Sequence, residues 1–103
     1  MKKIGFIGAY DKTDLIIYIA KILTTLKKKV LVIDATTKQK ARYVVPVINP
    51  TKMYVTEYEE IDIAVGFPNI EDIKRYLGYS EEQDLDYDIV LIDTDSIEGF
   101  SIF

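Results

Sequence analysis

Histidine, cysteine and tryptophan are absent from this chain of 103 residues, and only three prolines and five glycines are present. Without histidine or cysteine, the chain cannot form a Ser–His or Cys–His nucleophile, an imidazole or thiolate metal site, or a disulfide. A bound metal would therefore take oxygen ligands, which favour a hard ion such as Mg²⁺. The scarcity of proline and glycine, together with a hydrophobic share of 49%, is typical of one globular domain.

Acidic residues are scarce in the first half of the chain, and basic residues are scarce in the second half. Residues 1–52 hold three acidic against eleven basic residues, whereas residues 53–103 hold two basic against fourteen acidic residues. This separation indicates an anion-binding half, or a basic half that attracts the acidic half of another copy. The alternative is that both halves are simply solvated.

Long hydrophobic runs are also lacking. The longest mostly apolar stretch, Leu15–Leu26, is interrupted by polar side chains and is too short to span a bilayer. Met1 leads through two lysines into a short strand-like run, with no cleavage site after it. We therefore expect a soluble, cytoplasmic protein without a transmembrane segment.

The first third of the chain has the pattern of a strand, a helix and a second strand. Ile4–Ile7 and Val30–Ile33 are apolar runs typical of strands covered on both faces. Between them, Asp11 and Asp14 have the spacing of an N-cap and the third helical position. The residues expected on the buried helix face are Leu15, Ile16, Ile19, Ile22, Leu23 and Leu26. Such a βαβ unit requires the two strands to be parallel.

The middle of the chain predicts a hairpin. Tyr43–Ile48 is rich in β-branched residues, but Pro46 restricts it to an edge strand. A turn over residues 49–52 leads to Met53–Tyr58, which is expected to be the returning strand.

The second half continues the alternation of strands and helices. In Ile61–Val65, large apolar residues alternate with Asp62 and Ala64, as in a strand. A short helix is expected between Asn69 and Gly78. Ile89–Ile92 is a third buried parallel strand, and no element is predicted for residues 94–103. The predicted fold is a three-layer α/β domain with a mainly parallel sheet.

Residues that suit phosphate and magnesium follow the predicted parallel strands. Backbone N–H groups in the junction between the first strand and the helix favour anions. Carboxylates end the other two strands, at the edge where α/β sheets bind ligands, although aspartate also ends strands for local reasons at turns. Lysine, a hydroxyl and carboxylates at one edge suit phosphate with Mg²⁺. The predicted nucleotide-binding residues are Gly8, Ala9, Tyr10, Asp11, Lys12 and Thr13, and the predicted metal ligands are Thr13, Asp34 and Asp93.

Two parts of the chain, Lys3–Thr36 and Tyr87–Thr94, resemble P-loop NTPases of the ParA/MinD type, the deviant-Walker family of partition and cell-division ATPases. Four segments are similar in turn to the family's phosphate loop, first helix, second strand and Walker B strand: Ile4–Gly8 with Lys12 and Thr13, Tyr18–Leu23, Lys29–Asp34, and Tyr87–Thr94. The resemblance implies a P-loop NTPase-like, Rossmann-like fold with ATP and Mg²⁺ as cofactors. It also implies that residues 1–103 are the N-terminal part of a longer domain.

The chain departs from the family's loop pattern, K-G-G-x-G-K-[ST]. Ile7 replaces the signature lysine, Ala9 replaces the second glycine, and Asp11 replaces the glycine before the catalytic lysine. Thr36 stands where the family has an aspartate that positions the attacking water. Two like charges about 4 Å apart repel by about 4 kcal/mol at an effective dielectric near 20, so Asp11 opposes bound phosphate. The resemblance thus implies a degenerate ATPase that binds Mg-ATP weakly or not at all, and no catalytic residue is assigned.

Asp11 has a second interpretation that needs no nucleotide. As an N-cap it would stabilise the helix by about 1 kcal/mol and would occupy the anion site from within the chain. Lys12 would then be a surface lysine and Thr13 an ordinary residue of the first turn.

Three functions remain open from the sequence. The first is a degenerate ParA/MinD-like domain that binds or positions a protein partner, as in atypical members that localise pili or secretion machines. The second is a weak Mg-ATPase, and the third is a flavodoxin- or receiver-like interaction domain. Self-association that is independent of ATP and weakened by salt is expected, and direct nucleic-acid binding is not, because Lys27–Lys29 and Lys38–Arg42 lie at opposite ends of the predicted sheet.

Overall fold

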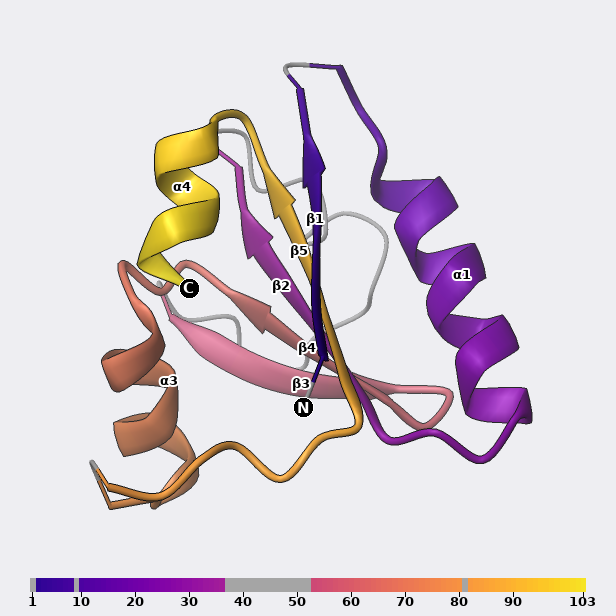
Figure 1. Cartoon of the computed structure of the whole chain (residues 1–103). Coiled ribbons are helices and arrows are strands. Elements are labelled where there is room, and N and C mark those ends of the chain that lie inside the picture. Colours follow the sequence, from indigo (N-terminus) through magenta and orange to yellow (C-terminus); the bar gives the residue numbers. More distant parts are fainter. Residues whose placement is uncertain (1, 9, 37–52, 81) are drawn as a thin grey trace.

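A computed structural model describes residues 2–8, 10–36, 53–80 and 82–103 of the chain. These residues form a five-stranded sheet with helices packed on it (Figure 1). The elements in chain order are β1 (Lys2–Ile7), α1 (Thr13–Thr25), β2 (Val30–Ala35), β3 (Tyr54–Tyr58), β4 (Ile61–Val65), α3 (Ile70–Leu77), β5 (Ile89–Thr94) and α4 (Ile97–Ile102).

The sheet is mostly parallel and has the strand order β1-β5-β2-β4-β3. β1, β5, β2 and β4 run parallel, and β3 pairs antiparallel with β4 at the edge. The last strand, β5, therefore lies between the first two strands of the chain. The predicted α/β fold with a mainly parallel sheet is confirmed, and β4 is an additional parallel strand.

Helices cover both faces of the sheet, as expected when parallel strands are buried on each side (Figure 1). Val30 and Val32 on β2 pack in one apolar cluster with residues of α1. Leu31 and Ile33, which alternate with them, pack in a second cluster that includes Ile73 of α3. Because successive side chains of a strand point to opposite faces, the even-numbered residues of β2 lie on the α1 side.

The buried face of α1 differs from the predicted one. Ile16, Ile17 and Ala20 are fully or almost fully buried, together with Thr13. Three residues expected on that face are exposed instead: Leu15, Ile22 and Leu26. The helix is apolar around most of its circumference, so periodicity alone fits two stripes, and packing on β2, β4 and β5 selects one of them.

β3 pairs with β4, while the predicted pairing of Met53–Tyr58 with Tyr43–Ile48 stays a prediction. Tyr43–Ile48 lies outside the described residues, and β3 pairs with β4 through a two-residue turn at Glu59 and Glu60. Both turn residues have positive φ, 51° and 70°, as the tight turn of a twisted hairpin requires. Neither residue is Asn or Gly, so the sequence carries no usual signal for this turn.

The C-terminal segment forms a helix that sequence analysis did not predict. Ser96 begins it, because the Ser96 side chain accepts a hydrogen bond from the N–H of Gly99 at 3.1 Å. Phe103 is buried, and the ring of Phe100 packs where a Cβ on Gly5 of β1 would lie. These aromatic residues therefore pack against the sheet. Six residues are too few to show a helical period.

The ends of α3 agree with the sequence. The side chain of Asn69 accepts a hydrogen bond from the N–H of Asp72 at 2.9 Å, and Gly78 ends the helix with a φ of 83°. In the part of the chain that the structure describes, no helix has the length and apolar character needed to cross a membrane.

Candidate functional site

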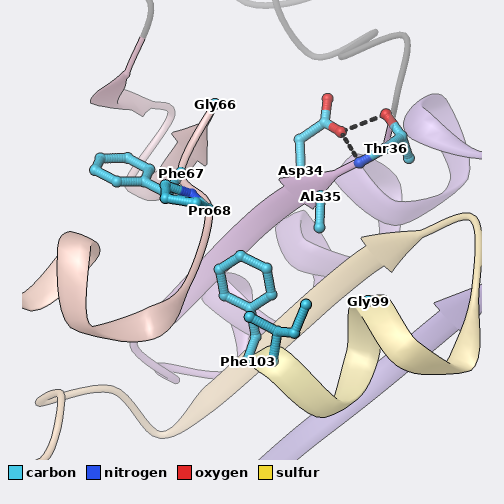
Figure 2. Close-up of a pocket in the computed structure, with 9 residues that line it drawn as sticks. Asp34, Ala35, Thr36, Gly66, Phe67, Pro68, Gly99 and Phe103 are labelled. Atoms are coloured by element: carbon cyan, nitrogen blue, oxygen red, sulfur yellow. Dashed lines mark hydrogen bonds between the residues drawn. The ribbon is translucent and has the colours of Figure 1, made fainter.

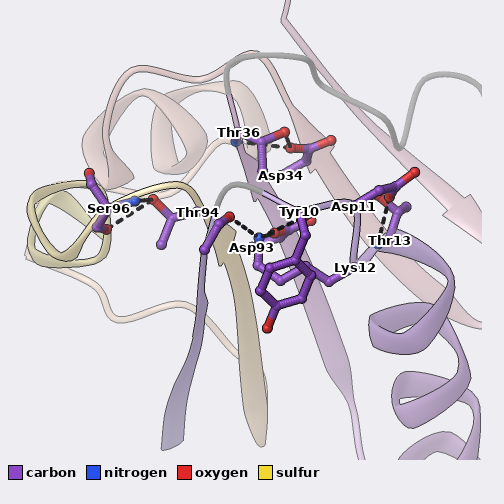
Figure 3. Close-up of polar contacts among 10 residues, drawn as sticks. Tyr10, Asp11, Lys12, Thr13, Asp34, Thr36, Asp93, Thr94 and Ser96 are labelled. Carbon is purple, nitrogen blue, oxygen red and sulfur yellow. Dashed lines mark hydrogen bonds and ion pairs between the residues drawn. The ribbon is translucent and has the colours of Figure 1, made fainter.

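Two carboxylates lie side by side at the carboxyl edge of the sheet. Asp34 on β2 and Asp93 on β5 are register partners, and both residues are buried. Both lie on the face that α1 covers, since they alternate with residues of the α3 side. The insertion of β5 next to β1 also brings Asp93 beside the loop that precedes α1 (Figure 3).

Lys12 extends from that loop into the edge of the sheet. Its Nζ lies 2.7 Å from Oδ1 of Asp93 and donates a hydrogen bond of 2.7 Å to the carbonyl of Gly8. The Tyr10 ring lies over the same ammonium, with its centroid 5.3 Å away. Lys12 is only 4% exposed, so the interpretation as a surface lysine is wrong.

The charge of Asp93 is unfavourable despite this ion pair. Burial raises the pKa of the Asp93 carboxyl, and the negative charge of Asp34 raises that pKa further. The hydrogen bond and positive charge of Lys12 lower the same pKa, but burial has the larger effect. The ionised carboxylate therefore depends on Lys12 for its stability.

Asp34 is held by the chain that follows β2. Its Oδ1 accepts one hydrogen bond from the N–H of Thr36 at 3.0 Å and another from the Thr36 hydroxyl at 2.6 Å. This is the local turn that aspartate forms with the residue two positions later. The resemblance implied an aspartate at position 36, but Thr36 supplies a donor to Asp34 instead of a second carboxylate.

The start of α1 is satisfied from within the chain. Lys12, not Asp11, occupies the N-cap position, which corrects the predicted cap by one residue. The Asp11 carboxylate nevertheless accepts a hydrogen bond of 3.1 Å from the N–H of Thr13, the first helical residue. A negative group thus already lies at the positive end of the helix.

The first residue of the loop is tied to β5. Gly8 donates its N–H to the carbonyl of Thr94 at 3.1 Å, which extends the pairing of β1 with β5. Gly8 has a φ of 154°, and a Cβ there would lie 2.6 Å from the Tyr10 ring. Of the predicted nucleotide-binding residues, Ala9 lies outside the described residues.

The predicted magnesium ligands are only partly brought together. Asp34 and Asp93 are neighbours, and Thr13 is buried at the start of α1, on the same side of the sheet. Within the described ranges, no group of three or more acidic residues is arranged to hold a metal ion. A magnesium ion at this edge would therefore need oxygen atoms from its own ligand, such as phosphate, besides the two carboxylates.

A cavity of about 260 Å³ lies beside this edge and was not anticipated from the sequence (Figure 2). Its walls come from the ends of β2 and β4 and from α4, and they are lined by Asp34, Ala35, Thr36, Gly66, Phe67, Pro68, Gly99, Ile102 and Phe103. The cavity depends on the helix α4, which sequence analysis missed, so no motif could have indicated it.

No protein-family model matches the chain, and neither a curated protein nor a solved structure matches it.

Proposed function

We propose that the protein is a ParA/MinD-like domain whose phosphate loop has degenerated and whose role is to bind or position a protein partner. The observation that carries this proposal is the buried ion pair of Lys12 with Asp93, at 2.7 Å. Lys12 would contact the phosphates of a nucleotide, and Asp93 would hold the magnesium ion that accompanies the nucleotide. The ion pair neutralises both side chains. Binding a nucleotide would require this pair to separate, which costs free energy before any new contact forms.

The position of Asp11 supports the same conclusion. Its carboxylate accepts the N–H of Thr13, which is one of the backbone donors that an incoming phosphate would use. A phosphate there would lose this donor and would also meet a like charge. Both effects disfavour Mg-ATP.

The strand order supports the resemblance on which the proposal is built. β5 carries the Walker B-like segment, and its place beside β1 puts Asp93 next to the loop that resembles a phosphate loop. The order does not fit the flavodoxin- or receiver-like alternative, in which the first strand pairs with the second and third. Here both edges of β2 are occupied by β5 and β4.

A weak Mg-ATPase is the second candidate, and one observation favours it. Asp34 and Asp93 are adjacent on the side of the sheet where Lys12 and Thr13 lie, so the main groups of a phosphate and magnesium site are present. In this case the ion pair of Lys12 would be the resting arrangement of a site that opens for its ligand.

Calorimetric titration with Mg-ATP and Mg-ADP separates the two candidates. The wild-type protein is expected to bind neither nucleotide below millimolar concentrations. Asp11→Gly is expected to improve binding at least tenfold, because it removes the like charge and frees the N–H of Thr13. Asp14→Gly is the matched control, since it removes an exposed carboxylate from the first turn of the same helix without freeing that N–H.

Submicromolar affinity of the wild-type protein for Mg-ATP would contradict the degenerate site. It would favour the weak ATPase, and phosphate release would then be measured. Equal binding by the wild type and Asp11→Gly would contradict the role assigned to Asp11.

A further inference from the structure

The outer face of α1 carries a row of large apolar side chains in contact with solvent. Leu15, Tyr18, Ile22 and Leu26 are 55%, 64%, 46% and 63% exposed. They follow one another at intervals of three or four residues, so they lie on one side of the helix. A soluble domain seldom exposes such a contiguous row unless a partner covers it. We call these four residues the α1 stripe.

The two ends of the α1 stripe carry opposite charges. Asp14 lies in the first turn of α1, next to Leu15, and is exposed. Lys27 and Lys28 directly follow Leu26 and are also exposed. The charges next to the row are therefore acidic at its start and basic in the turn that follows its end.

We propose that the α1 stripe pairs with the α1 stripe of a second copy of this chain, with the two helices antiparallel around a two-fold axis. In that orientation each acidic end meets a basic end, the apolar rows meet each other, and the helix dipoles oppose. A parallel pair would instead place Asp14 beside Asp14 and lysines beside lysines. The charge pattern thus favours a second copy of the chain as the partner, and it favours the antiparallel orientation of the two helices.

The spacing of the α1 stripe suits such a pair. Leu15, Tyr18 and Ile22 have the alternating three- and four-residue intervals of a coiled-coil seam. With the helices antiparallel, Leu15 of one copy lies opposite Leu26 of the second, and Tyr18 lies opposite Ile22. α1 has 13 residues and is therefore about 20 Å long, so the contact is short, and we expect a dimer of micromolar stability.

The interface is independent of the proposed function. The α1 stripe lies on the side of the helix opposite the buried residues Ile16, Ile17 and Ala20, which pack in the core. Lys12 and Asp93 instead form their ion pair at the carboxyl edge of the sheet (Figure 3). Association should therefore be the same with and without Mg-ATP. An anionic membrane surface is a poorer partner for the α1 stripe, because it would repel the acidic end of the row.

Sedimentation velocity over a micromolar concentration series tests the proposal. The wild type is expected to form a dimer, and Ile22→Glu is expected to raise the dissociation constant at least tenfold. Ile97→Glu is the matched control, because it places the same change at an exposed isoleucine of α4, on the other side of the sheet, and should leave the dimer intact. A wild type that remains monomeric throughout, or equal effects of the two variants, would overturn the proposal.

Charge exchange tests the orientation. Asp14→Lys should weaken the dimer, and adding Lys28→Asp to the same chain should restore much of the lost affinity, because each new lysine then faces a new aspartate. A parallel pair would give no such rescue. Thermal unfolding of each variant separates loss of association from loss of folding.

The absence of cysteine allows a direct check of proximity. A mixture of Tyr18→Cys and Ile22→Cys chains places thiols at positions that face each other in the proposed pair, and it is expected to form disulfide-linked dimers under mild oxidation. Glu71→Cys on α3 is not expected to do so. Equal linking by the mixture and by Glu71→Cys would contradict the interface. A monomeric wild type that sediments with anionic vesicles, and loses this binding in Ile22→Glu, would assign the α1 stripe to a membrane surface instead.

Discussion

Lys12, in the loop before α1, and Asp93, at the end of β5, form an ion pair whose side chains are almost completely removed from solvent. The pair joins the loop before α1 to the carboxyl end of β5, which lies between β1 and β2. Burial raises the pKa of Asp93, so the lysine offsets a cost that the fold imposes on the carboxylate. Its energetic role can be measured independently of any ligand.

Replacing Lys12 by Met should destabilise the protein by about 3 kcal/mol, because it leaves the Asp93 carboxylate buried without its cation. Adding Asp93→Asn should recover part of this loss, since the uncompensated charge is then removed. Urea unfolding of the wild type, both single variants and the double variant measures the coupling energy.

The matched control is Lys21→Met, which removes the lysine of an exposed pair with Glu59 at 2.6 Å. Exposed pairs contribute about 0–1 kcal/mol, so its effect should be much smaller. Similar losses for Lys12→Met and Lys21→Met would show that burial of the Lys12 pair has no energetic importance.

Gly5→Ala should destabilise the protein by about 1–3 kcal/mol, because the new methyl group would overlap the ring of Phe100. The same substitution in a Phe100→Ala background should cost much less, since the ring is gone. Thermal unfolding of the four proteins gives the coupling. Equal costs in both backgrounds would mean that α4 does not pack over β1.

Lys27→Gly should stabilise the protein by about 1 kcal/mol. Lys27 ends α1 with a φ of 68°, and the N–H of Lys28 bonds to the carbonyl of Leu23 at 3.1 Å. This is the arrangement that usually places glycine at the left-handed position, as α3 does at Gly78. Chemical denaturation measures the gain.

Lys28→Gly is the control for that gain. It removes a lysine from the adjacent position, where the structure gives no positive φ, so it should not stabilise the protein. If both variants gave the same change, loss of charge and not relief of backbone strain would be responsible.

Stability should fall at alkaline pH through Tyr87. Burial is the larger cause that raises the pKa of the Tyr87 hydroxyl above 10.0, and its 2.7 Å hydrogen bond to Asp62 raises that pKa further. The unfolded tyrosine then ionises at lower pH than the folded one. The stabilisation is complete below pH 10 and is lost as pH rises toward the folded pKa.

Urea unfolding between pH 8 and pH 11 checks this dependence. The free energy of unfolding of Tyr87→Phe should decline less above pH 10 than that of the wild type. Asp62→Asn should show an intermediate slope, because it removes the negative charge but leaves the buried site. Identical slopes for the wild type and Tyr87→Phe would assign the alkaline loss to other groups.

Local patterns in the sequence were sufficient for the elements that carry strong signals. Apolar runs identified β2 and β5, and the cap at Asn69 and the glycine at position 78 identified α3. The carboxyl ends of parallel strands meet at one edge, so the strand pattern placed Asp34 and Asp93 at the same edge, and the pairing of β5 with β2 made them neighbours. The chemistry that histidine and cysteine would supply was excluded from composition.

Tertiary structure decided the features for which the sequence offered equal alternatives. α1 has two apolar stripes, and contact with the sheet buried Ile16, Ile17 and Ala20 while leaving the α1 stripe exposed. The insertion of β5 between β1 and β2 decided that Lys12 is buried against Asp93 instead of lying on the surface. The turn at Glu59 and Glu60 and the short helix α4 also depend on long-range packing, because neither has a local signal strong enough to specify it. The sequence by itself determined the kind of each strongly patterned element and the edge where polar groups gather, because these depend on local periodicity. Contacts between residues far apart in the chain decided which charged groups pair at that edge, as Lys12 does with Asp93.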